Sequence, residues 1–544
     1  MSPYPNQPPP YEDRNLFTTN VALREALVRE SAQWAESALT AWGERMGRAE
    51  AFALARAANR HGPELRILDR TGERIDAVDF HPAWHELMRL ATTAGEHASP
   101  WSEPRAGAQV ARAAMYIVHG EVENGTQCPV TMTYASVPAL RAHGADVSVI
   151  AQQWLPRILA FDYDPRPLPI AQKRAALIGM GMTERQGGSD VRSNRTRAER
   201  TSDGSYRLAG EKWFFSAPQC DAHLVLAQAD AGLSCFLVPR ELDDGTRNAI
   251  RLVRLKDKLG NRSNASSEVE FHGALAWRLG DEGRGIATIL DMVQHTRLDC
   301  VIGAAGIMRG AFAWALHHAS HRFAFGRLLV DQPLMRAVLA DIALEVEAGI
   351  ALAMRLARTF EADASPADRA LARVLTPAAK YWLCKRGPML AAEAMEVLGG
   401  NGYVEENPLP RMYREMPVNS IWEGSGNVIA LDVMRALSRD GATRDALFLE
   451  LDKAKGSDAR FDSAITSLAD ALNTDSDDPA QARRFAQRIA LTVQAGFLVR
   501  HAPAAIADGF IASRLNESVY GGAAFGALPS GVDTQTILRR ANGT

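Results

Sequence analysis

The chain has 544 residues, and its 61 Lys and Arg residues against 64 Asp and Glu residues give a formal net charge of −3. A length of this order predicts roughly three or four structural units at about 100–200 residues each. A hydrophobic content of 47% with 23% charged residues excludes a wholly disordered chain. The near-neutral balance excludes a nucleic-acid binder that works through global charge, so any such role requires a local basic patch.

The cysteines and the first residues bear on compartment. Five cysteines are scattered without a CxxC pair, which excludes a disulfide framework or a thiolate zinc site, and we expect no bound metal. The opening stretch MSPYPNQPPPYEDR has no apolar run behind a basic start, and no uninterrupted run of about 18 apolar residues follows. We therefore expect a cytoplasmic protein that does not use a membrane.

Periodicity along the chain predicts four segments. A polar, proline-rich arm over residues 1–15 and amphipathic helical patterns from about residue 20 make up an N-terminal helical domain at 1–179. Short alternating runs between Gly, Ser and Asn clusters predict a β-sheet or barrel domain at 180–285. Apolar periodicity typical of helices returns at 286–440, and a helical extension follows at 441–544. The predicted fold is mainly α with a central antiparallel β domain, and a ligand is expected where sheet and helices meet.

Four runs in the β domain carry the strand signal. They are rich in β-branched and aromatic residues and are bounded by turn residues. They read SYRLAGEKWFFS (205–216), AHLVLAQ (222–228), LSCFLVPR (233–240) and SSEVEFHG (266–273).

The first motif with chemical content is the loop GMTERQGGSD at residues 181–190. Two hydroxyls and a Gly-Gly pair allow backbone N–H groups to approach a ligand closely. The loop lacks the GxGxxG and GxxxxGK[ST] patterns, so neither phosphate cradle is supported. A polar loop at a domain boundary is the alternative.

The second motif is GEKWFFS at residues 210–216. Its aromatic residues followed by Ser216 could place a ring beside a flat cofactor and a hydroxyl at the cofactor's edge. A buried strand is the alternative.

The third motif joins EVLGGNGY (396–403) with NSIWEGSGN (419–427). Glu423 lies between Trp422 and a Gly-Ser-Gly turn, directly before an apolar helical run whose first N–H groups favour an anionic ligand. Apolar surroundings raise the pKa of a carboxyl group, which suits a general base.

Together these motifs resemble the acyl-CoA dehydrogenase family over about residues 80–440. The resemblance is carried by Met182-Thr183-Glu184 with Gly188-Ser189-Asp190, the aromatic strand, Arg322 to Gly326, LGGNGY at 398–403 and Glu423-Gly424-Ser425. Within the family the chain is most similar to the AidB branch, flavoproteins of the adaptive response to DNA alkylation. The runs WFFSAPQ and REMPVNSIWEGSGNV and the extension 441–544 carry that finer resemblance.

The resemblance implies FAD as the cofactor and an acyl-CoA dehydrogenase-like fold with a C-terminal helical extension. Glu423 is implied as the base that removes the α-proton of an acyl-CoA, and Arg322 as a contact to the FAD pyrophosphate of a neighbouring subunit in a homotetramer. The other implied cofactor contacts are Met182, Thr183, Ser189, Phe214, Phe215, Ser216, Ile421, Trp422, Glu423, Gly424, Ser425, Gly426, Asn427 and Leu431.

The AidB branch further implies non-specific binding of double-stranded DNA through the extension and protection of DNA from alkylating agents. Eleven Lys and Arg residues against twelve Asp and Glu residues give the extension no basic excess. A local face remains open at Arg483, Arg484 and Arg488, with a solvated helix surface as the alternative.

Two other functions stay open. One is an ordinary short- or branched-chain acyl-CoA dehydrogenase whose extension only serves oligomerisation. The other is a flavin-bearing DNA scaffold or repressor without turnover.

Overall fold

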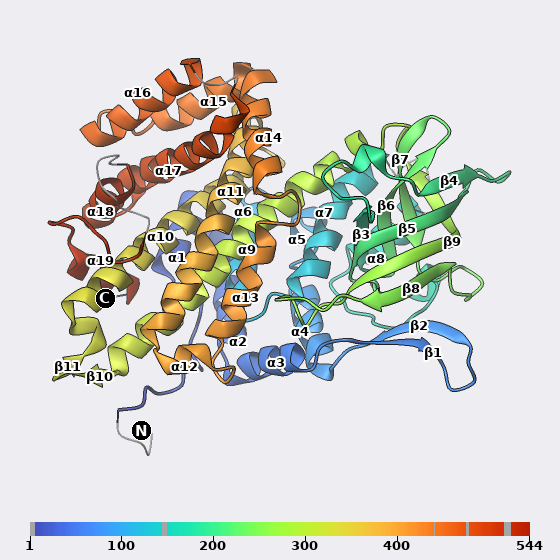
Figure 1. Cartoon of the computed structure of the whole chain (residues 1–544), viewed down its shortest axis with the longest axis horizontal. Coiled ribbons are helices and arrows are strands. Elements are labelled where there is room, and N and C mark those ends of the chain that lie inside the picture. The colour runs from blue at the N-terminus through green and yellow to red at the C-terminus, as the bar shows by residue number, and fades with distance from the viewer. Residues whose placement is uncertain (1–5, 144–149, 440, 475–477, 516–523, 544) are drawn as a thin grey trace. The chain divides into compact units, whose positions relative to one another are not determined.

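The computed structural model describes residues 6–143, 150–439, 441–474, 478–515 and 524–543 (Figure 1). The chain divides into two compact units. Unit 1 contains residues 1–52, 105–122 and 297–544, and unit 2 contains residues 53–104 and 123–296. The units cut across the four segments expected from the sequence, whose boundaries stay predictions. The first five residues of the predicted arm, and the parts of the predicted helical segments in the remaining gaps, lie outside the described residues.

Unit 2 is built on a seven-stranded sheet in the order β3-β5-β4-β6-β7-β9-β8. Most neighbours pair antiparallel, whereas β6 pairs parallel with β3 and β4. All four strands predicted from the runs above are present. The strands are β3 (Ile178–Thr183), β4 (Arg197–Arg200), β5 (Tyr206–Ser216), β6 (Ala222–Ala229), β7 (Gly232–Pro239), β8 (Ile250–Leu255) and β9 (Ser266–Leu279).

A hairpin also belongs to unit 2, within the predicted N-terminal helical domain but outside its helical patterns, which cover about residues 20–60 and resume at residue 81. It is formed by β1 (Glu64–Leu68) and β2 (Arg74–Asp79). The Asp69 carboxylate accepts backbone N–H bonds from Thr71 and Glu73, and Gly72 has a φ of 89°, so the turn closes through an aspartate and a glycine. The remaining elements are α4 (Pro82–Thr93), α5 (Ser99–Ser102), α7 (Gln127–His143), α8 (Leu155–Ile158), and the short turns Ile150–Trp154, Ile170–Gln172 and Val191–Ser193.

The regular structure described in unit 1 is helical apart from a ribbon of two strands with two residues each. Two helices cross the division of the chain: α3 (Ala49–Arg60) begins in unit 1, and α9 (Gly285–His321) begins in unit 2. The other elements are α1 (Val21–Arg29), α2 (Glu36–Met46), α6 (Ala108–Gly120), β10 (Phe323–Ala324), β11 (Arg327–Leu328), α10 (Pro333–Arg358), α11 (Pro366–Val397), α12 (Gly400–Tyr403), α13 (Leu409–Asn419), α14 (Gly426–Arg439), α15 (Gly441–Asp452), α16 (Ala459–Thr474), α17 (Ala482–His501), α18 (Ala504–Arg514), α19 (Thr534–Ala541), and the short turns Gln33–Ala35, Leu329–Asp331 and Pro479–Gln481.

Helix α11 begins where the sequence supplies a cap. The Ser365 hydroxyl accepts the Asp368 N–H and the Asp368 carboxylate accepts in return, while Pro366 occupies the first turn of α11. By length and composition α9 could cross a membrane, but 94% of its apolar window is buried within the protein, as in the core helix of a globular fold.

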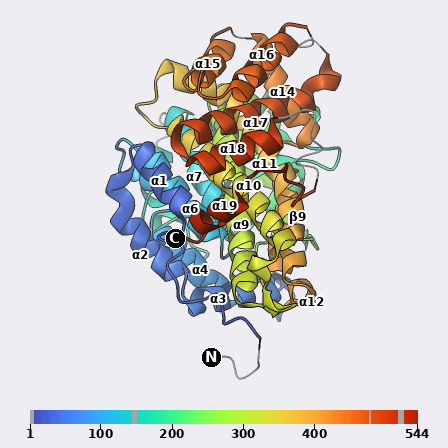
Figure 2. The same ribbon diagram turned by 90° about the vertical axis from the view of Figure 1, so that its left-hand side faces the viewer.

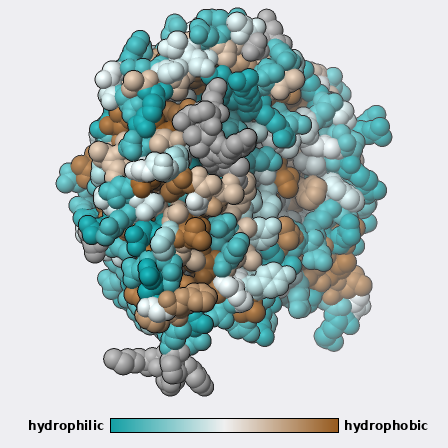
Figure 3. Space-filling view, turned by 60° about the vertical axis from the view of Figure 1, so that its left-hand side comes forward, coloured by the Kyte–Doolittle hydropathy of each residue, from teal (hydrophilic) through white to brown (hydrophobic). Residues whose placement is uncertain are grey.

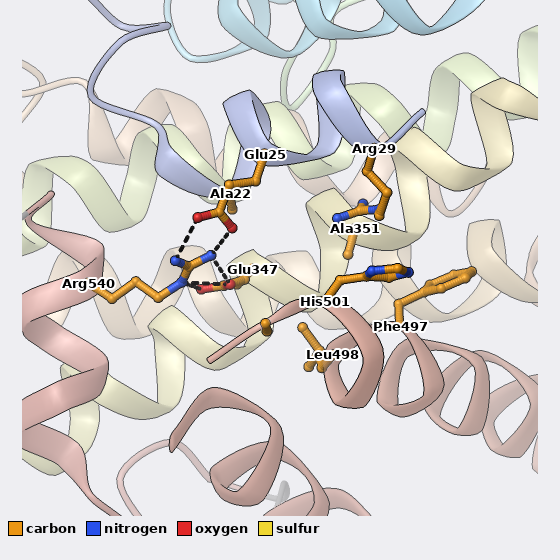
Figure 4. Close-up of a pocket in the computed structure, with 10 residues that line it drawn as sticks. Ala22, Glu25, Arg29, Glu347, Ala351, Phe497, Leu498, His501 and Arg540 are labelled. Atoms are coloured by element: carbon orange, nitrogen blue, oxygen red, sulfur yellow. Dashed lines mark hydrogen bonds and ion pairs between the residues drawn. The ribbon is translucent and has the colours of Figure 1, made fainter. Parts of the chain in front are cut away.

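The predicted extension packs as part of unit 1. Helices α15 and α17 pack on α11, α17 also packs on α14, and α19 packs on α10, as Figure 2 shows for the red and yellow helices. The Arg514 side chain is 2% exposed and pairs with Asp341 and Glu345 of α10, which are 0% and 1% exposed. Figure 4 shows Arg540 of α19 between Glu25 of α1 and Glu347 of α10.

The described part of the predicted arm lies on unit 1. Tyr11 is buried, with its ring 5.2 Å from the rings of Trp314 and His317, and His317 contacts the Pro9 carbonyl. On the face in Figure 3, apolar side chains are interspersed with hydrophilic ones.

Candidate active site

The predicted base lies in the turn between α13 and α14. Glu423 has a φ of 58° and Gly424 a φ of 109°, so two successive residues adopt positive φ. For a non-glycine residue this conformation costs about 1–3 kcal/mol and needs support from the surrounding structure. The turn is therefore built for one specific placement of the Glu423 side chain.

Two cations hold the backbone of this turn. Arg297 of α9 donates from Nε to the Glu423 carbonyl at 3.0 Å. Lys380 of α11, 1% exposed, donates from Nζ to the carbonyls of Asn419 at 3.0 Å and Gly424 at 2.9 Å. Carbonyl groups removed from water need a hydrogen-bond donor. These bonds supply donors to carbonyls of the turn that have no partner within a helix.

Asp432 balances the charge of this support. Its carboxylate accepts from Arg297 at 2.7 Å and from Arg373 at 2.7 Å. Burial opposes the charge of Asp432, but the Arg373 hydrogen bond and the two guanidinium charges outweigh it and lower the pKa of the carboxyl. Asp432 therefore stays ionised and keeps Arg297 in place.

The start of α14 brings a predicted cofactor residue next to a predicted DNA residue. The helix begins at Gly426, and the side-chain oxygen of Asn427 accepts from Nε of Arg483 at 2.8 Å. A Cβ on Gly426 would lie 2.9 Å from Cε of Lys385, so only glycine fits there without a shift of that side chain. The sequence analysis assigned Asn427 to cofactor binding and Arg483 to DNA binding. It did not predict a contact between the two residues.

In unit 2 the predicted loop and the aromatic strand lie side by side. Strands β3 and β5 pair so that Thr183 faces Phe214 and Met180 faces Ser216. Phe214 is 51% exposed, and Ser189 is exposed in the loop that follows β3. A hydroxyl-bearing edge and an exposed ring thus lie side by side, and their contact with a cofactor stays a prediction.

Glu184 anchors this loop. Its carboxylate accepts from Nζ of Lys212 at 2.8 Å and from the backbone N–H groups of Arg195 and Thr196. Burial lowers the pKa of Lys212 to about 8 against the raising effect of Glu184. Burial raises the pKa of Glu184, but Lys212 and the backbone donors outweigh it, so its pKa lies below the ordinary value. Both groups are therefore charged near pH 7, and the pair fixes the loop to β5.

Phe215, unlike Phe214, is buried. It is 1% exposed, lies in the core of the sheet and stacks on His223 with ring centroids 4.0 Å apart. Strand alternation explains this placement, since neighbouring residues of β5 point to opposite faces. The side chain predicted as a cofactor contact instead packs beneath Phe214.

Arg322 follows α9 directly and is held by the arm. It donates from Nη1 to the Asn6 carbonyl at 2.7 Å, while the Asn6 side chain exchanges hydrogen bonds with the backbone of Phe323. Phe325, at the tip of the β10–β11 ribbon, is 97% exposed. The sequence gave no indication that the arm reaches this turn.

The residues of the Glu423 turn and those at the paired strands β3 and β5 have the chemistry that FAD requires. Hydroxyls at Thr183, Ser189 and Ser216 suit the polar edge of a flavin and its phosphates, and the exposed Phe214 ring suits its flat face. Glycine is required where the backbone is crowded: a Cβ on Gly188 would lie 2.4 Å from the Thr183 hydroxyl. Among the described residues, no group of three or more His, Cys, Asp or Glu side chains could hold a metal ion.

The fold and these motifs define a flavin-dependent oxidoreductase of the acyl-CoA dehydrogenase type. Three family models match: "Adaptive response protein AidB N-terminal domain" at residues 6–165, "Acyl-CoA dehydrogenase, middle domain" at 179–274 and "Acyl-CoA dehydrogenase, C-terminal domain" at 283–438. The chain belongs to the acyl-CoA dehydrogenase family, in its AidB branch. The predicted family, fold, oxidoreductase class and FAD cofactor are confirmed at this level.

Three similar proteins span most of the chain. AidB of Escherichia coli (strain K12), whose name assigns it to the acyl-CoA dehydrogenases, is 54% identical over 86% of each chain. The solved ACDH-11 of Caenorhabditis elegans, in complex with C11-CoA, is 27% identical with a TM-score of 0.85, over 94% of this chain and 91% of the other. The apo form of Bd2924 is 29% identical with a TM-score of 0.82, over 91% and 99%.

The predicted DNA-contacting residues lie on α17. Arg483 and Arg484 are exposed, and Arg488 donates from Nη2 to the Ser467 hydroxyl at 2.6 Å. Most other cations of the extension are engaged within the protein: Lys453, Arg460, Arg500, Arg514 and Arg540 each pair with a carboxylate.

Proposed function

We propose that the protein oxidises an acyl-CoA thioester with Glu423 as the catalytic base. The supporting observation is the turn itself, in which a glutamate at positive φ is held through its own carbonyl by Arg297 and through the next residue by Lys380. Such support fixes where a carboxylate meets a bound thioester, and placement is a large part of catalysis.

In this proposal the residues of the chain carry the proton chemistry. Glu423 takes the proton from the carbon next to the thioester carbonyl, and Lys380 and Arg297 keep the turn in place while its charge changes. FAD, when bound, accepts the hydrogen of the neighbouring carbon as hydride. Trp422, the neighbour of Glu423 in the sequence, donates from Nε1 to Asn419 at 3.1 Å, and we propose that its bulk limits the room for the acyl group.

FAD contacts are proposed at strands β3 and β5 with the loop after β3, and at the Glu423 turn and the helix that follows it. From unit 2 they include Met182, Thr183, Ser189, Phe214 and Ser216. From unit 1 they include the stretch from Ile421 to Leu431, with Arg322 contacting the cofactor of a neighbouring copy. We further propose a homotetramer, and the exposed Phe325, three residues after Arg322, is suited to an interface between copies.

Anaerobic mixing with short and branched acyl-CoA thioesters tests this function. The proposal expects saturable loss of the visible flavin absorbance in the wild type. A yellow protein that no acyl-CoA bleaches would overturn it, and a colourless protein that cannot be reconstituted with FAD would overturn the cofactor site as well.

A second function is favoured by the AidB-type N-terminal domain model and the E. coli relative. We propose that the protein binds double-stranded DNA without sequence preference, protects it from alkylating agents in the adaptive response, and acts in the cytoplasm. The ion pairs of the extension restrict the contact to a small face, and the exposed Arg484 is its best candidate. A homotetramer would gather four such faces and gain affinity through multivalency.

A titration of random duplex DNA over a series of salt concentrations tests this second function. Binding should weaken steeply with salt, with a slope of about 0.9 per neutralised phosphate on logarithmic axes. Arg484→Ala should lower that slope by roughly one for each phosphate that the arginine neutralises, and Arg369→Ala on α11 serves as the charge-matched control. Absent or salt-independent binding would refute it and favour a metabolic dehydrogenase whose extension only builds the oligomer.

A further inference from the structure

One hydrogen bond joins the extension to the proposed cofactor site. Arg483 lies in the first turn of α17, and its Nε is 2.8 Å from Oδ1 of Asn427 in the first turn of α14. Its Nη2 would lie 3.8 Å from a Cβ on Gly426. Arg483 therefore contacts the helix start that follows the Glu423 turn.

The chemistry of this pair fixes the orientation of Asn427. A guanidinium group has donors only, whereas a carboxamide has an acceptor on one side and two donors on the other. With Oδ1 accepting from Arg483, the Nδ2 group of the same carboxamide is left to donate to another acceptor. Without Arg483, the two orientations of the amide would be close in energy.

We propose that Arg483 is a positioning residue of the FAD site, which holds Asn427 so that its Nδ2 donates to an oxygen of the cofactor. The inference rests on the proposed FAD contact at Asn427 and adds to it a contribution from the extension. It also assigns Arg483 and its neighbour Arg484 to different tasks, although both are exposed arginines on one helix.

The surroundings of Arg483 agree with this role. Its charge acts on Tyr381 of α11, where burial raises the pKa of the phenol and Arg483 opposes that rise. Lys385, also on α11, approaches the same position, with its Nζ 3.4 Å from a Cβ on Gly426. The start of α14 thus has two cations close by, which favours the negatively charged portion of a dinucleotide there.

The affinity of the apoprotein for FAD, measured by the quenching of flavin fluorescence, tests the inference. Arg483→Ala should weaken FAD binding about three- to tenfold, the range that one lost hydrogen bond supports. Arg484→Ala removes the same charge one residue further along α17 and should leave FAD affinity unchanged. Equal effects of the two variants, or none in either, would overturn the inference.

Asn427→Asp provides a second, independent test that does not depend on the stability of the arginine variants. The aspartate keeps an acceptor for Arg483 and gains an ion pair, but it has no proton to donate to the cofactor. FAD affinity should therefore fall at least about tenfold while the thermal midpoint of the apoprotein is maintained. Retained FAD affinity in this variant would overturn the role of Nδ2.

A double-mutant cycle links the two residues. If Arg483 acts only through Asn427, adding Arg483→Ala to Asn427→Ala should weaken FAD binding no further, whereas additive losses would contradict positioning. A wild-type apoprotein that does not bind FAD would overturn the proposed function itself. A wild type that binds FAD while Arg483→Ala loses nothing would overturn only this inference.

Discussion

Nε of Arg297 lies 3.0 Å from the carbonyl oxygen of Glu423, and Nη1 of the same guanidinium lies 2.7 Å from Asp432. One side chain of α9 therefore ties the turn that carries the base to the body of α14. Because Lys380 donates to the Gly424 carbonyl, helices α9 and α11 both hold this turn. The bonds from Arg297 to Glu423 and from Lys380 to Gly424 span 126 and 44 positions of the sequence, so the candidate base is positioned by distant parts of the chain.

Replacing the base should separate cofactor binding from chemistry. Glu423→Gln keeps the shape of the side chain and leaves the backbone bonds of the turn intact, so FAD content and the thermal midpoint should match the wild type. Anaerobic bleaching by acyl-CoA should fall by about a thousandfold or more, since no carboxylate remains to take the proton. Glu44→Gln, an exposed change on α2, is the matched control. Unchanged bleaching in Glu423→Gln would remove Glu423 from the mechanism.

Lys380→Met should affect the turn without touching the substrate. The substitution leaves the buried carbonyl of Asn419 and the partly buried carbonyl of Gly424 without Lys380 as donor, and an unsatisfied buried acceptor costs about 1–3 kcal/mol. We expect a lower free energy of unfolding in urea, together with a lower kcat and a nearly unchanged KM. Lys455→Met, at an exposed lysine of the extension, should change neither quantity. A stability loss with unaltered kcat would limit Lys380 to a structural role.

Removal of Arg514 should show that the extension is part of unit 1. Arg514→Met leaves Asp341 and Glu345 buried with less compensation, although Arg386 still contacts Glu345. Breaking a buried pair in this way costs about 3–5 kcal/mol. Urea unfolding should report a loss of that size, and Arg460→Met, whose pairs are exposed, should lose less than about 1 kcal/mol. A fully stable Arg514→Met would indicate that the extension is a separable module.

The sequence predicted the parts of the site that depend on local pattern. Strand β5, the loop after β3 and the helix beginning at Gly426 follow from β-branched and aromatic content, glycine positions and apolar periodicity, whereas the exposure of Phe214 was not predicted. The burial of Phe215 could have been predicted from strand alternation, because it lies between an exposed residue and a half-exposed one.

Long-range hydrogen bonds could not be predicted in this way. The bonds from Arg297 to Glu423, from Arg322 to Asn6 and from Arg483 to Asn427 join residues 56 to 316 positions apart. An arginine in a helical pattern has the same local signature whether it faces solvent or a carbonyl of another helix. Net charge misleads for the same reason, since it counts the arginines of the extension without showing that Arg460, Arg500, Arg514 and Arg540 pair with carboxylates of the protein.

Glu450 of α15 is a buried carboxylate held by three cations. Burial opposes its charge, but the charge and hydrogen bond of Arg355, aided by Lys453, outweigh burial and lower the pKa of Glu450 to about 2. Its side chain is 4% exposed, and Arg500 of α17 also donates to it at 2.9 Å. A carboxyl whose pKa is lower in the folded state stabilises that state above the unfolded pKa, and the contribution disappears as pH falls toward the folded pKa.

The stability contributed by Glu450 should therefore be lost in acid. At pH 7 the wild type should exceed Glu450→Gln by about 3 kcal/mol in urea unfolding, and the difference should shrink between about pH 5 and pH 2. Asp445→Asn on the same helix, an exposed change, should show no such pH dependence. A difference that is constant with pH would mean that Glu450 stabilises the fold through packing rather than through its charge.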